Sequence, residues 1–346
     1  MSIEALGSGH IHDTYRVRLA DTARGDLVFQ RINTAVFPAA ERLATNLERV
    51  TRALAASLTR RALDQPERRC LRLIEAPDGR THLQDAAGRW WRAFPFIAAS
   101  HASDAPAHPD QARAAGRAFG GFLADLSDLD ASQLEETIPH FHDLGARLAT
   151  LDATERELAP KAAREEADAC RRLAEAFPAR WESALPLRPV HNDCKFNNLL
   201  FDDATGEALC VVDLDTVMPG RALYDFGDLV RTASCTTPED EPDPSRVGVD
   251  APLFAALGEG FVAGTRGQLA PEEVASLAVA GPRMALENAV RFLTDHWQGD
   301  PYFRVHRPGQ NLDRCRAQLA LGHAFLTERS AAEDRFAALA REHAAG

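Results

Sequence analysis

A histidine, an aspartate, a lysine and an asparagine are closely spaced in the stretch HNDCKFNNLLF. His191, Asp193 and Asn198 fit the pattern H-x-D-x-x-x-x-N, in which the aspartate and the asparagine are five residues apart. At this spacing a carboxylate can accept or orient the proton of an attacking hydroxyl group, and an amide oxygen can help to hold magnesium against nucleotide phosphates. Lys195 lies close enough to meet the charge that develops on a γ-phosphate. The pattern therefore predicts phosphoryl transfer, with Asp193 and Lys195 as catalytic residues and Asn198 as a metal ligand.

A magnesium ion also needs a carboxylate, and three aspartates follow the catalytic stretch. Asp213 ends the apolar run ALCVV, where a strand would deliver a carboxylate into a cleft, and Asp215 would point the same way. Asp225 belongs to the letters Asp-Phe-Gly, which mark the metal aspartate of protein kinases, but it lies 12 residues beyond Asp213. We therefore predict Asp213 as the primary metal ligand and Asp215 as an additional one. Asp225 and Asp228 are expected to brace the catalytic loop through hydrogen bonds to its backbone or to Arg231.

Hydrophobic patterning predicts the elements that would position these residues. The catalytic stretch leads into a predicted β-hairpin, because the runs NNLLF and ALCVV flank the letters ATGE, with Gly206 at the turn. In the first hundred residues the pattern predicts strands at 26–32 and within 81–97, and a long helix at 37–58. Beyond a Pro-containing break at 103–110, the chain is predicted to be mostly helical.

This order of elements predicts an α+β fold with two lobes rather than an alternating α/β sheet. We place a β-rich, nucleotide-binding lobe at residues 1–98 and a larger, mainly helical lobe with the catalytic loop at residues 99–346. The segment 236–250 is acidic and rich in proline, and we expect it to form a surface loop.

The N-terminal lobe should supply a cover for the nucleotide phosphates. Gly7 and Gly9 precede a predicted strand, and glycine lets backbone N–H groups approach phosphates closely. An ordinary hairpin turn would have the same composition. The adenine ring is expected to contact the hinge after WWRAF, at Phe96 and Ile97.

The strand lysine that usually binds the α- and β-phosphates of a nucleotide is absent. The strand VFQRIN offers Arg31 as its cation, with Gln30 on the opposite face. Because arginine can bind phosphate through two hydrogen bonds, we predict that Arg31 takes the place of the lysine. Its acidic partner on the following helix is expected to be Glu41 or Glu48.

The amino-acid composition indicates which kinds of molecule this protein is expected to bind. The 346 residues are 45% hydrophobic and 26% charged, as in ordinary globular proteins, and the net charge of −12 argues against nucleic acid. No apolar run approaches the length of a membrane helix, and the first residues do not have the pattern of a secretory signal. Six scattered cysteines without a C-x-x-C pair suggest reduced thiols. We expect a cytoplasmic protein, a monomer or homodimer, without nucleic-acid or membrane partners.

Two functions outside kinase chemistry fit the sequence less well. A metal hydrolase could start from His191 and Asp193, but the only other histidine cluster is HFHD at 140–143, and H-E-x-x-H is missing. A non-catalytic nucleotide-binding protein would lack the base or a metal ligand, whereas this chain has both.

Together these residues resemble the aminoglycoside phosphotransferase and choline kinase superfamily, which is marked by H-x-D-x-x-x-x-N followed by an apolar residue and D-x-D or D-x-E. The chain is more similar to one branch, the N-acetylhexosamine 1-kinases. The stretches that carry this similarity are GHIHDTY, VFQRINTAVF, TIPHFHD, DLDTVMPGRALYDFGDLVR, RFLTDHWQGDPYF and NLDRCR. One departure is His12, at a position where the branch often has asparagine.

The resemblance implies a protein-kinase-like fold and an enzyme that uses ATP and Mg²⁺. Such enzymes phosphorylate the anomeric (C1) hydroxyl of an N-acetylhexosamine, GlcNAc or GalNAc. Carried over to this sequence, the resemblance makes Asp193 the base and places a sugar-binding site in the helical lobe. Arg291 and Tyr302 would contact the sugar, and His10 would reach the cleft.

A second class of substrate remains open within the same superfamily. The acceptor could be an aminoglycoside or an amino alcohol such as choline. A cationic acceptor needs a pocket lined by carboxylates, and Glu287 and Asp295 in the predicted C-terminal helices are candidates for it.

Overall fold

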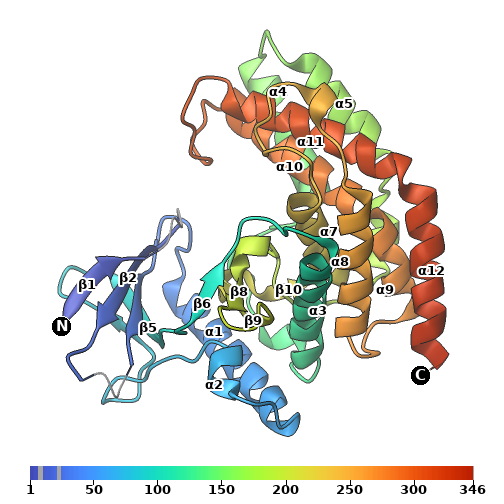
Figure 1. Ribbon diagram of the computed structural model, residues 1–346. Coiled ribbons are helices and arrows are strands. Elements are labelled where there is room, and N and C mark those ends of the chain that lie inside the picture. The colour runs from blue at the N-terminus through green and yellow to red at the C-terminus, as the bar shows by residue number, and fades with distance from the viewer. Residues whose placement is uncertain (7–10, 22–24, 346) are drawn as a thin grey trace.

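The computed structural model describes residues 1–6, 11–21 and 25–345, and its N-terminal part is a five-stranded antiparallel sheet (Figure 1). The strand order is β1-β2-β3-β5-β4, and the strands are β1 (Ser2–Ala5), β2 (Asp13–Arg18), β3 (Leu27–Arg31), β4 (His82–Gln84) and β5 (Trp90–Pro95). The predicted strand at 26–32 is β3, and the region 81–97 contains the β4–β5 hairpin. This hairpin turns at Gly88, whose φ of 77° is readily adopted only by glycine.

Helix α1 (Ala40–Arg60) crosses from the sheet to the rest of the molecule. Leu47, Val50 and Leu54 recur at helical spacing and are buried, which confirms the predicted helix at 37–58. These side chains pack in the same hydrophobic core as the C-terminal helices. Its first turn packs with Ile32 and Phe37 in a second cluster, so α1 contacts both the N-terminal part and the helical lobe.

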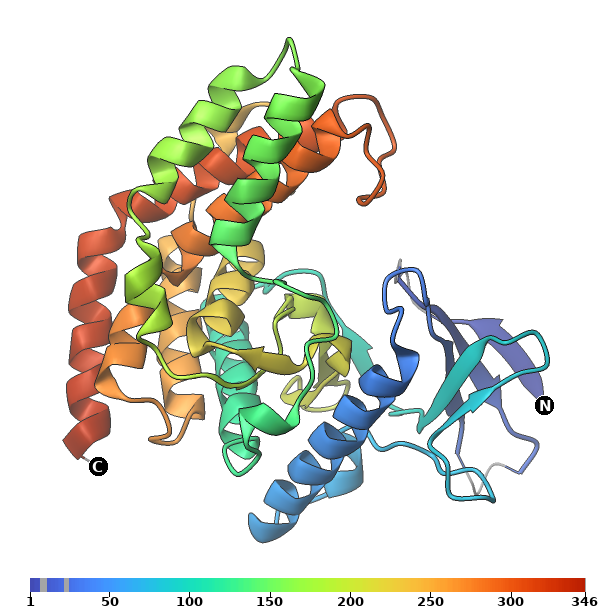
Figure 2. The same cartoon turned by 180° about the vertical axis from the view of Figure 1, so that it is seen from behind.

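The C-terminal part is mainly helical, as predicted, and its helices gather on the side of the molecule away from the sheet (Figures 1 and 2). After the short α2 (Pro66–Arg69), the helices are α3 (Pro109–Asp125), α4 (Leu144–Leu158), α5 (Arg164–Ala174), α6 (Ala179–Ser183), α7 (Ala222–Ala233), α8 (Ala251–Gly264), α9 (Pro271–Ser276), α10 (Ala280–Trp297), α11 (Gln310–Thr327) and α12 (Arg329–Ala345). Helix α10 is buried along most of its length and packs against α4, α7 and α11. It forms the centre of the lobe.

Helices α3 and α8 pack backbone against backbone. A Cβ atom added at Gly116 or Gly120 of α3 would lie 2.2 Å or 2.1 Å from the carbonyl oxygen of Leu257 or Phe261 in α8. Only glycine allows so close an approach. Because α3 also contacts β9, this closely packed pair supports the hairpin that carries the catalytic residues.

Two small sheets carry the residues predicted to do chemistry. One consists of β6 (Ser100–Ala102), β8 (Leu199–Asp202) and β9 (Ala208–Val211), and the other of β7 (Arg188–Val190) and β10 (Met218–Gly220). The β8–β9 hairpin turns at Gly206 with a φ of 70°, which confirms the predicted hairpin. The catalytic loop lies between β7 and β8, and Asp213 follows β9.

The architecture confirms the predicted α+β fold with a β-rich N-terminal lobe and a larger helical C-terminal lobe. Among the described residues, no helix combines the length and the apolar composition needed to cross a membrane.

The acidic segment 236–250 is tied to the helical lobe more firmly than a plain surface loop. Glu241 is buried, and Glu239 forms an ion pair with the buried Arg231 at 2.7 Å. The acidic composition predicted that this segment is exposed to solvent. The sequence alone does not reveal that the buried guanidinium of Arg231 supplies the opposite charge.

Candidate active site

Asp193, Lys195 and Asn198 converge in the loop between β7 and β8. Nζ of Lys195 lies 2.7 Å from Oδ1 of Asp193. Nδ2 of Asn198 donates to the backbone oxygen and to Oδ2 of Asp193, at 2.9 Å and 3.1 Å. Burial alone would raise the pKa of Asp193, but the positive charge of Lys195 and the hydrogen bonds from Lys195 and Asn198 together hold this pKa below its ordinary value. Asp193 is therefore kept as a carboxylate, the form that can accept a hydrogen bond or a proton from a hydroxyl group.

Asp225 lies beneath this loop, in the first turn of α7, and is fully buried. Its carboxylate accepts hydrogen bonds from the backbone N–H groups of His191 at 3.0 Å and Asn192 at 2.7 Å. The φ of Asn192 is 63°, a strained conformation that persists only where surrounding contacts hold it. These contacts confirm that Asp225 braces the catalytic loop, and Asp228 pairs with Arg231 at 2.8 Å, as expected.

Replacing Asp225 is expected to reduce stability. Asp225→Ala leaves two buried backbone N–H groups without an acceptor, so the free energy of unfolding should fall by about 2–4 kcal/mol. Urea denaturation followed by circular dichroism measures the change. Asp203→Ala is the control, because Asp203 is exposed and pairs with the exposed His101. An Asp225→Ala protein as stable as the control would contradict the bracing role.

Asp213 and Asn198 have oxygen atoms available for a metal ion. Asp213 has a φ of 61°, and within the described residues its carboxylate has neither a hydrogen bond nor an ion pair. Its side chain reaches solvent, but the surrounding protein limits its hydration. This burial and the negative charges of Asp215 and Asp193 raise the pKa of Asp213. Asn198 binds Asp193 through its Nδ2, and its Oδ1 has no hydrogen-bond partner among the residues that the structure describes.

This donor set fits Mg²⁺, which is usually held by one or two protein carboxylates together with water and phosphate oxygens. In the described parts of the chain, no group of three or more His, Cys, Asp or Glu side chains could hold a metal by itself. A metal ion at Asp213 would therefore depend on the nucleotide phosphates for part of its coordination.

Asp215 differs from Asp213, because its carboxylate is already paired. Both of its oxygens accept hydrogen bonds from the guanidinium of Arg92, one of them at 2.6 Å, and His12 also bonds to it. Burial would raise the pKa of Asp215, but Arg92 and His12 hold it below its ordinary value. Direct metal ligation would require Asp215 to give up partners, so these contacts favour a structural role. Its assignment as a second ligand stays a prediction.

The cation that binds the carboxylate of Asp215 is Arg92 of β5, whereas the predicted phosphate contact of Arg31 in β3 stays a prediction. Arg31 points to the other face of β3 and pairs with Asp13, a partner outside the predicted choice of Glu41 or Glu48. Gln30 faces the inner side, where its Oε1 accepts from Nε of its cross-strand neighbour Arg92 at 3.0 Å. Sequence reasoning missed Arg92 because only the register of β3 against β5 places it next to Gln30.

The residues predicted to contact the nucleotide are described only in part. Three residues fall outside the described ranges, and their predicted contacts stay predictions: Gly7, Gly9 and His10. Phe96 and Ile97 lie between β5 and β6, where the chain passes from the sheet to the helical lobe. The N–H of Phe96 donates to the backbone oxygen of Asp26 at 2.8 Å, and the guanidinium of Arg16 lies 3.8 Å from the centre of the Phe96 ring.

Arg291 lies among aromatic rings near the loop that follows α10. Its guanidinium carbon is 5.5 Å, 5.9 Å and 5.2 Å from the ring centres of Phe141, Tyr302 and Phe303. Within the described residues it has no carboxylate partner. The structure thus brings together Arg291 and Tyr302, the two residues that the resemblance assigned to the sugar.

Arg147 of α4 adds a second cation beside Arg291, which sequence reasoning missed. Its Nη2 donates to the backbone oxygen of Phe141 at 2.9 Å, while its buried Nε has no hydrogen-bond partner among the described residues. Burial and the positive charge of Arg291 lower the pKa of Arg147. Two neighbouring guanidinium groups are therefore present without an ion-pair partner in the described chain.

Glu287, a candidate carboxylate for a cationic acceptor, is fully buried and already paired. Oε1 lies 2.9 Å from Nδ1 of His142, and Oε2 pairs with Arg283. Burial would raise the pKa of Glu287, but His142 and Arg283 hold it well below its ordinary value. Nε2 of His142 donates to the backbone oxygen of Asn192 at 2.8 Å, so this buried network also connects the Arg147 and Arg291 region to the catalytic loop.

Asp295, the other candidate, is also engaged. Its carboxylate accepts from the backbone N–H groups of Tyr302 at 2.8 Å and Phe303 at 3.0 Å, and from Nδ2 of Asn311 at 2.9 Å. It holds the loop after α10 in place. Neither predicted carboxylate is therefore free to line a pocket for a cationic acceptor.

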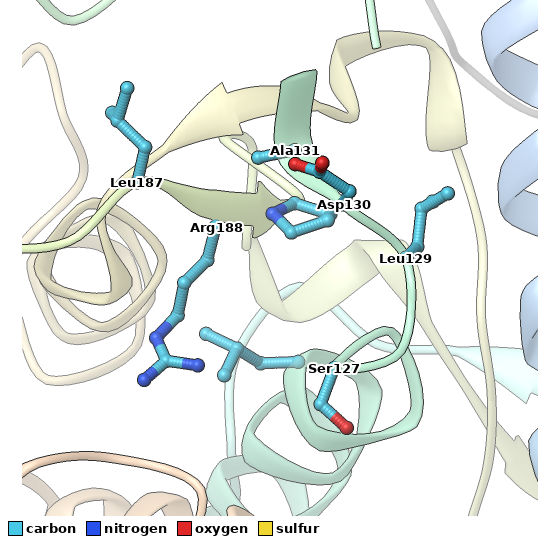
Figure 3. A pocket seen from close by; sticks show the side chains of 8 residues that line it. Ser127, Leu129, Asp130, Ala131, Leu187 and Arg188 are labelled. Atoms are coloured by element: carbon cyan, nitrogen blue, oxygen red, sulfur yellow. The ribbon is translucent and has the colours of Figure 1, made fainter. Parts of the chain in front are cut away.

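A small surface cavity lies at the start of β7, at the end of this strand away from the catalytic loop (Figure 3). Its volume is about 190 Å³, and Leu129, Asp130, Leu187 and Arg188 are among the residues that line it. The guanidinium of Arg188 is engaged by Glu273 at 2.7 Å. None of the predicted site residues lines this cavity.

The two-lobe fold, with Asp193, Lys195 and Asn198 in one loop and Asp213 after the next hairpin, defines a phosphotransferase of the protein-kinase-like class. Residues 2–260 match the model of the phosphotransferase enzyme family, APH, and the chain belongs to this family. The match includes the catalytic loop and Asp213, whereas Arg291 and Tyr302 lie beyond it.

Solved structures show the same fold at low sequence identity. A choline/ethanolamine kinase family protein from Mesorhizobium loti is 18% identical with a TM-score of 0.53, and the match covers 99% of this chain and 93% of that one. For choline kinase from Cryptosporidium parvum Iowa II, the identity is 12%, the TM-score 0.56 and the coverage 96% and 90%. A spectinomycin phosphotransferase in complex with ADP and spectinomycin is 10% identical with a TM-score of 0.51. That match covers 94% of this chain and 92% of the other one.

Proposed function

We propose that this phosphotransferase is an N-acetylhexosamine 1-kinase, which transfers the γ-phosphate of ATP to the C1 hydroxyl of GlcNAc or GalNAc. The proposal is carried by Arg147 and Arg291, two cations that contact Phe141 and have no ion pair with a carboxylate among the described residues. His142, which follows Phe141 in the chain, bonds to Asn192 in the catalytic loop. An acetamido group can present its carbonyl oxygen to a guanidinium and its methyl group to the aromatic rings. A cationic acceptor would be repelled at the same place.

In the proposed reaction, Asp193 accepts a hydrogen bond from the C1 hydroxyl and orients its oxygen toward the phosphate. An anomeric hydroxyl is more acidic than an ordinary alcohol, so orientation and charge neutralisation carry most of the catalysis. Lys195, now paired with Asp193, would meet the phosphoryl oxygens. Asn198 and Asp213 are the residues that would hold magnesium, which neutralises phosphate charge when bound.

An aminoglycoside or amino alcohol acceptor is the second candidate. It is consistent with the solved structures of similar fold, which are a choline/ethanolamine kinase family protein, a choline kinase and a spectinomycin phosphotransferase. Against it, Glu287 and Asp295 are occupied by other partners of this chain. The balance of charge near Arg291 therefore favours a neutral, carbonyl-bearing acceptor.

A panel of acceptors distinguishes an N-acetylhexosamine kinase from a kinase of aminoglycosides or amino alcohols. The protein is incubated with ATP and Mg²⁺ together with GlcNAc, GalNAc, glucose, choline or an aminoglycoside, and ADP release is followed. Turnover with an N-acetylhexosamine, and a sugar 1-phosphate as product, is the expected result. Turnover with choline or an aminoglycoside alone would replace the sugar proposal with the second candidate, while no turnover with any N-acetylhexosamine would overturn the sugar proposal.

Arg291→Ala tests the acceptor site separately. We expect the KM for the N-acetylhexosamine to rise roughly tenfold to a hundredfold, as for the loss of a charged hydrogen bond worth about 1.5–3 kcal/mol. The KM for ATP should change little. Arg329→Ala is a matched control, since the one ion pair of Arg329 within the described part of the chain is with the exposed Glu333 on α12. If the acceptor KM of Arg291→Ala equals that of the control, Arg291 does not bind the acceptor.

A further inference from the structure

One carboxylate of the helical lobe receives side chains from two segments of the N-terminal lobe. Asp215 lies in the short 3-10 helix Leu214–Thr216, two residues after Asp213. The guanidinium of Arg92 in β5 bonds to both oxygens of Asp215, and His12, next to β2, bonds to Oδ2. The side chains of His12, Arg92 and Asp215 are all at least 95% buried.

Further hydrogen bonds fix the orientation of the side chains that bind Asp215. Nδ1 of His12 accepts from the backbone N–H of Asn33 at 3.0 Å, so Nε2 carries the proton and donates to Asp215. Gln30 accepts from Nε and Nη2 of Arg92 at 3.0 Å and 2.8 Å, which fixes the plane of the guanidinium. A buried charge pair of this kind is stable only when its partners stay in place.

Asp215, Arg92 and His12 link the N-terminal sheet to the helical lobe. In the described parts of the chain, every side-chain hydrogen bond from the five-stranded sheet and His12 to residues beyond 99 ends on Asp215. Apolar contacts also cross between the lobes, since Phe94 of β5 lies in the same core as the C-terminal helices and Val28 of β3 packs against that core. Ile138 packs against the apolar cluster that contains Ile32 and Phe37, which is a further contact between the N-terminal and helical lobes.

We propose that Asp215, Arg92 and His12 form an interlobe clamp that holds the nucleotide cleft closed and positions the Asp213 segment before nucleotide arrives. Asp215 is then a positioning residue, not a metal ligand. In protein kinases the corresponding ion pair joins the strand β3 lysine to a helix glutamate within one lobe. Here the cation comes from β5 and the carboxylate from the other lobe, so the pair controls lobe closure directly. The clamp rests on the phosphotransferase function but not on the identity of the acceptor.

Asp215→Asn tests the clamp, because asparagine keeps the shape of the side chain and removes its charge. Two measurements are made without Mg²⁺ and without acceptor, in the presence of EDTA: small-angle X-ray scattering of the ligand-free protein, and titration calorimetry with ADP. We expect a larger radius of gyration than for wild type and an affinity for ADP that is weaker by roughly tenfold or more.

Asp85→Asn is the matched control, since Asp85 pairs with Arg89 and Trp91 entirely within the β4–β5 hairpin. It should leave both the scattering and the affinity for ADP unchanged. Circular dichroism checks that each variant is folded. If Asp215→Asn does not fold, Arg92→Lys replaces it, because lysine keeps the charge but cannot bind both oxygens of Asp215 in parallel. This variant should show the same two changes.

The clamp is overturned if the variants scatter like wild type and bind ADP equally well in EDTA. If, in that case, the Mg²⁺ concentration for half-maximal turnover rises in Asp215→Asn, Asp215 is a metal ligand instead. Failure of the sugar proposal would leave these measurements intact, since neither scattering nor ADP binding needs an acceptor.

Discussion

Asp193→Asn should reduce kcat by about 10²–10⁴, the range of effects typical for a positioned proton acceptor. Asparagine has the same shape, but its amide cannot take a proton from the attacking hydroxyl. Asn198 and Lys195 lie within hydrogen-bonding distance of this side chain, so the loop should keep its conformation. The KM for ATP should therefore change far less than kcat.

Steady-state kinetics with saturating Mg²⁺ and a range of acceptor concentrations measure this effect, and circular dichroism confirms folding. Asp203→Asn serves as the control, because Asp203 is an exposed carboxylate beyond the same β8 strand. A turnover rate for Asp193→Asn close to that of wild type would show that the assigned role of Asp193 is wrong.

Asp213→Ala is expected to abolish magnesium-dependent turnover, with kcat/KM reduced by about 10³ or more, because charge stabilisation in the transition state is lost. The variant should still fold, although alanine is disfavoured at the φ of this position. In the described chain the Asp213 carboxylate binds no protein group, and the charges of Asp215 and Asp193 repel it. The combination of lost activity and retained stability distinguishes this side chain from Asp225.

Stability is the second measurement for Asp213. Burial and like charges raise the pKa of this carboxyl in the folded state, so the ionised group destabilises the fold at neutral pH. Since alanine is disfavoured at a φ of 61°, Asp213→Asn is the better variant for this purpose. Its melting temperature at pH 7 should equal or exceed that of wild type. A clearly lower value would mean that Asp213 makes a stabilising contact.

Local sequence patterns predicted the parts of the site that lie close together in the chain. Asp193, Lys195 and Asn198 are neighbours in one loop, and Gly206 marks the hairpin that brings Asp213 after them. The spacing of such groups is fixed by the backbone over a few residues, so their meeting follows from the sequence. The helix at 37–58 was predictable for the same reason, because its apolar spacing is a local property.

Contacts between distant segments were beyond this kind of reasoning. The alternation of side chains along β3 placed Arg31 and Gln30 on opposite faces, but it could not show that Arg31 pairs with Asp13 and that Gln30 binds Arg92. Arg92 is placed by strand register, and its partner Asp215 is 123 residues away. Arg147 and Arg291 meet only because α4 packs against α10.

By itself, the sequence determined the phosphotransferase chemistry and the two-lobe class, since both rest on short patterns and on the order of elements. The tertiary structure alone decided that Arg92 binds Asp215, that Glu287 and Asp295 are already paired, and that α1 packs against the helical lobe. The physical reason is that buried charges need partners, and the partners are selected by packing across the fold and not by spacing along the chain.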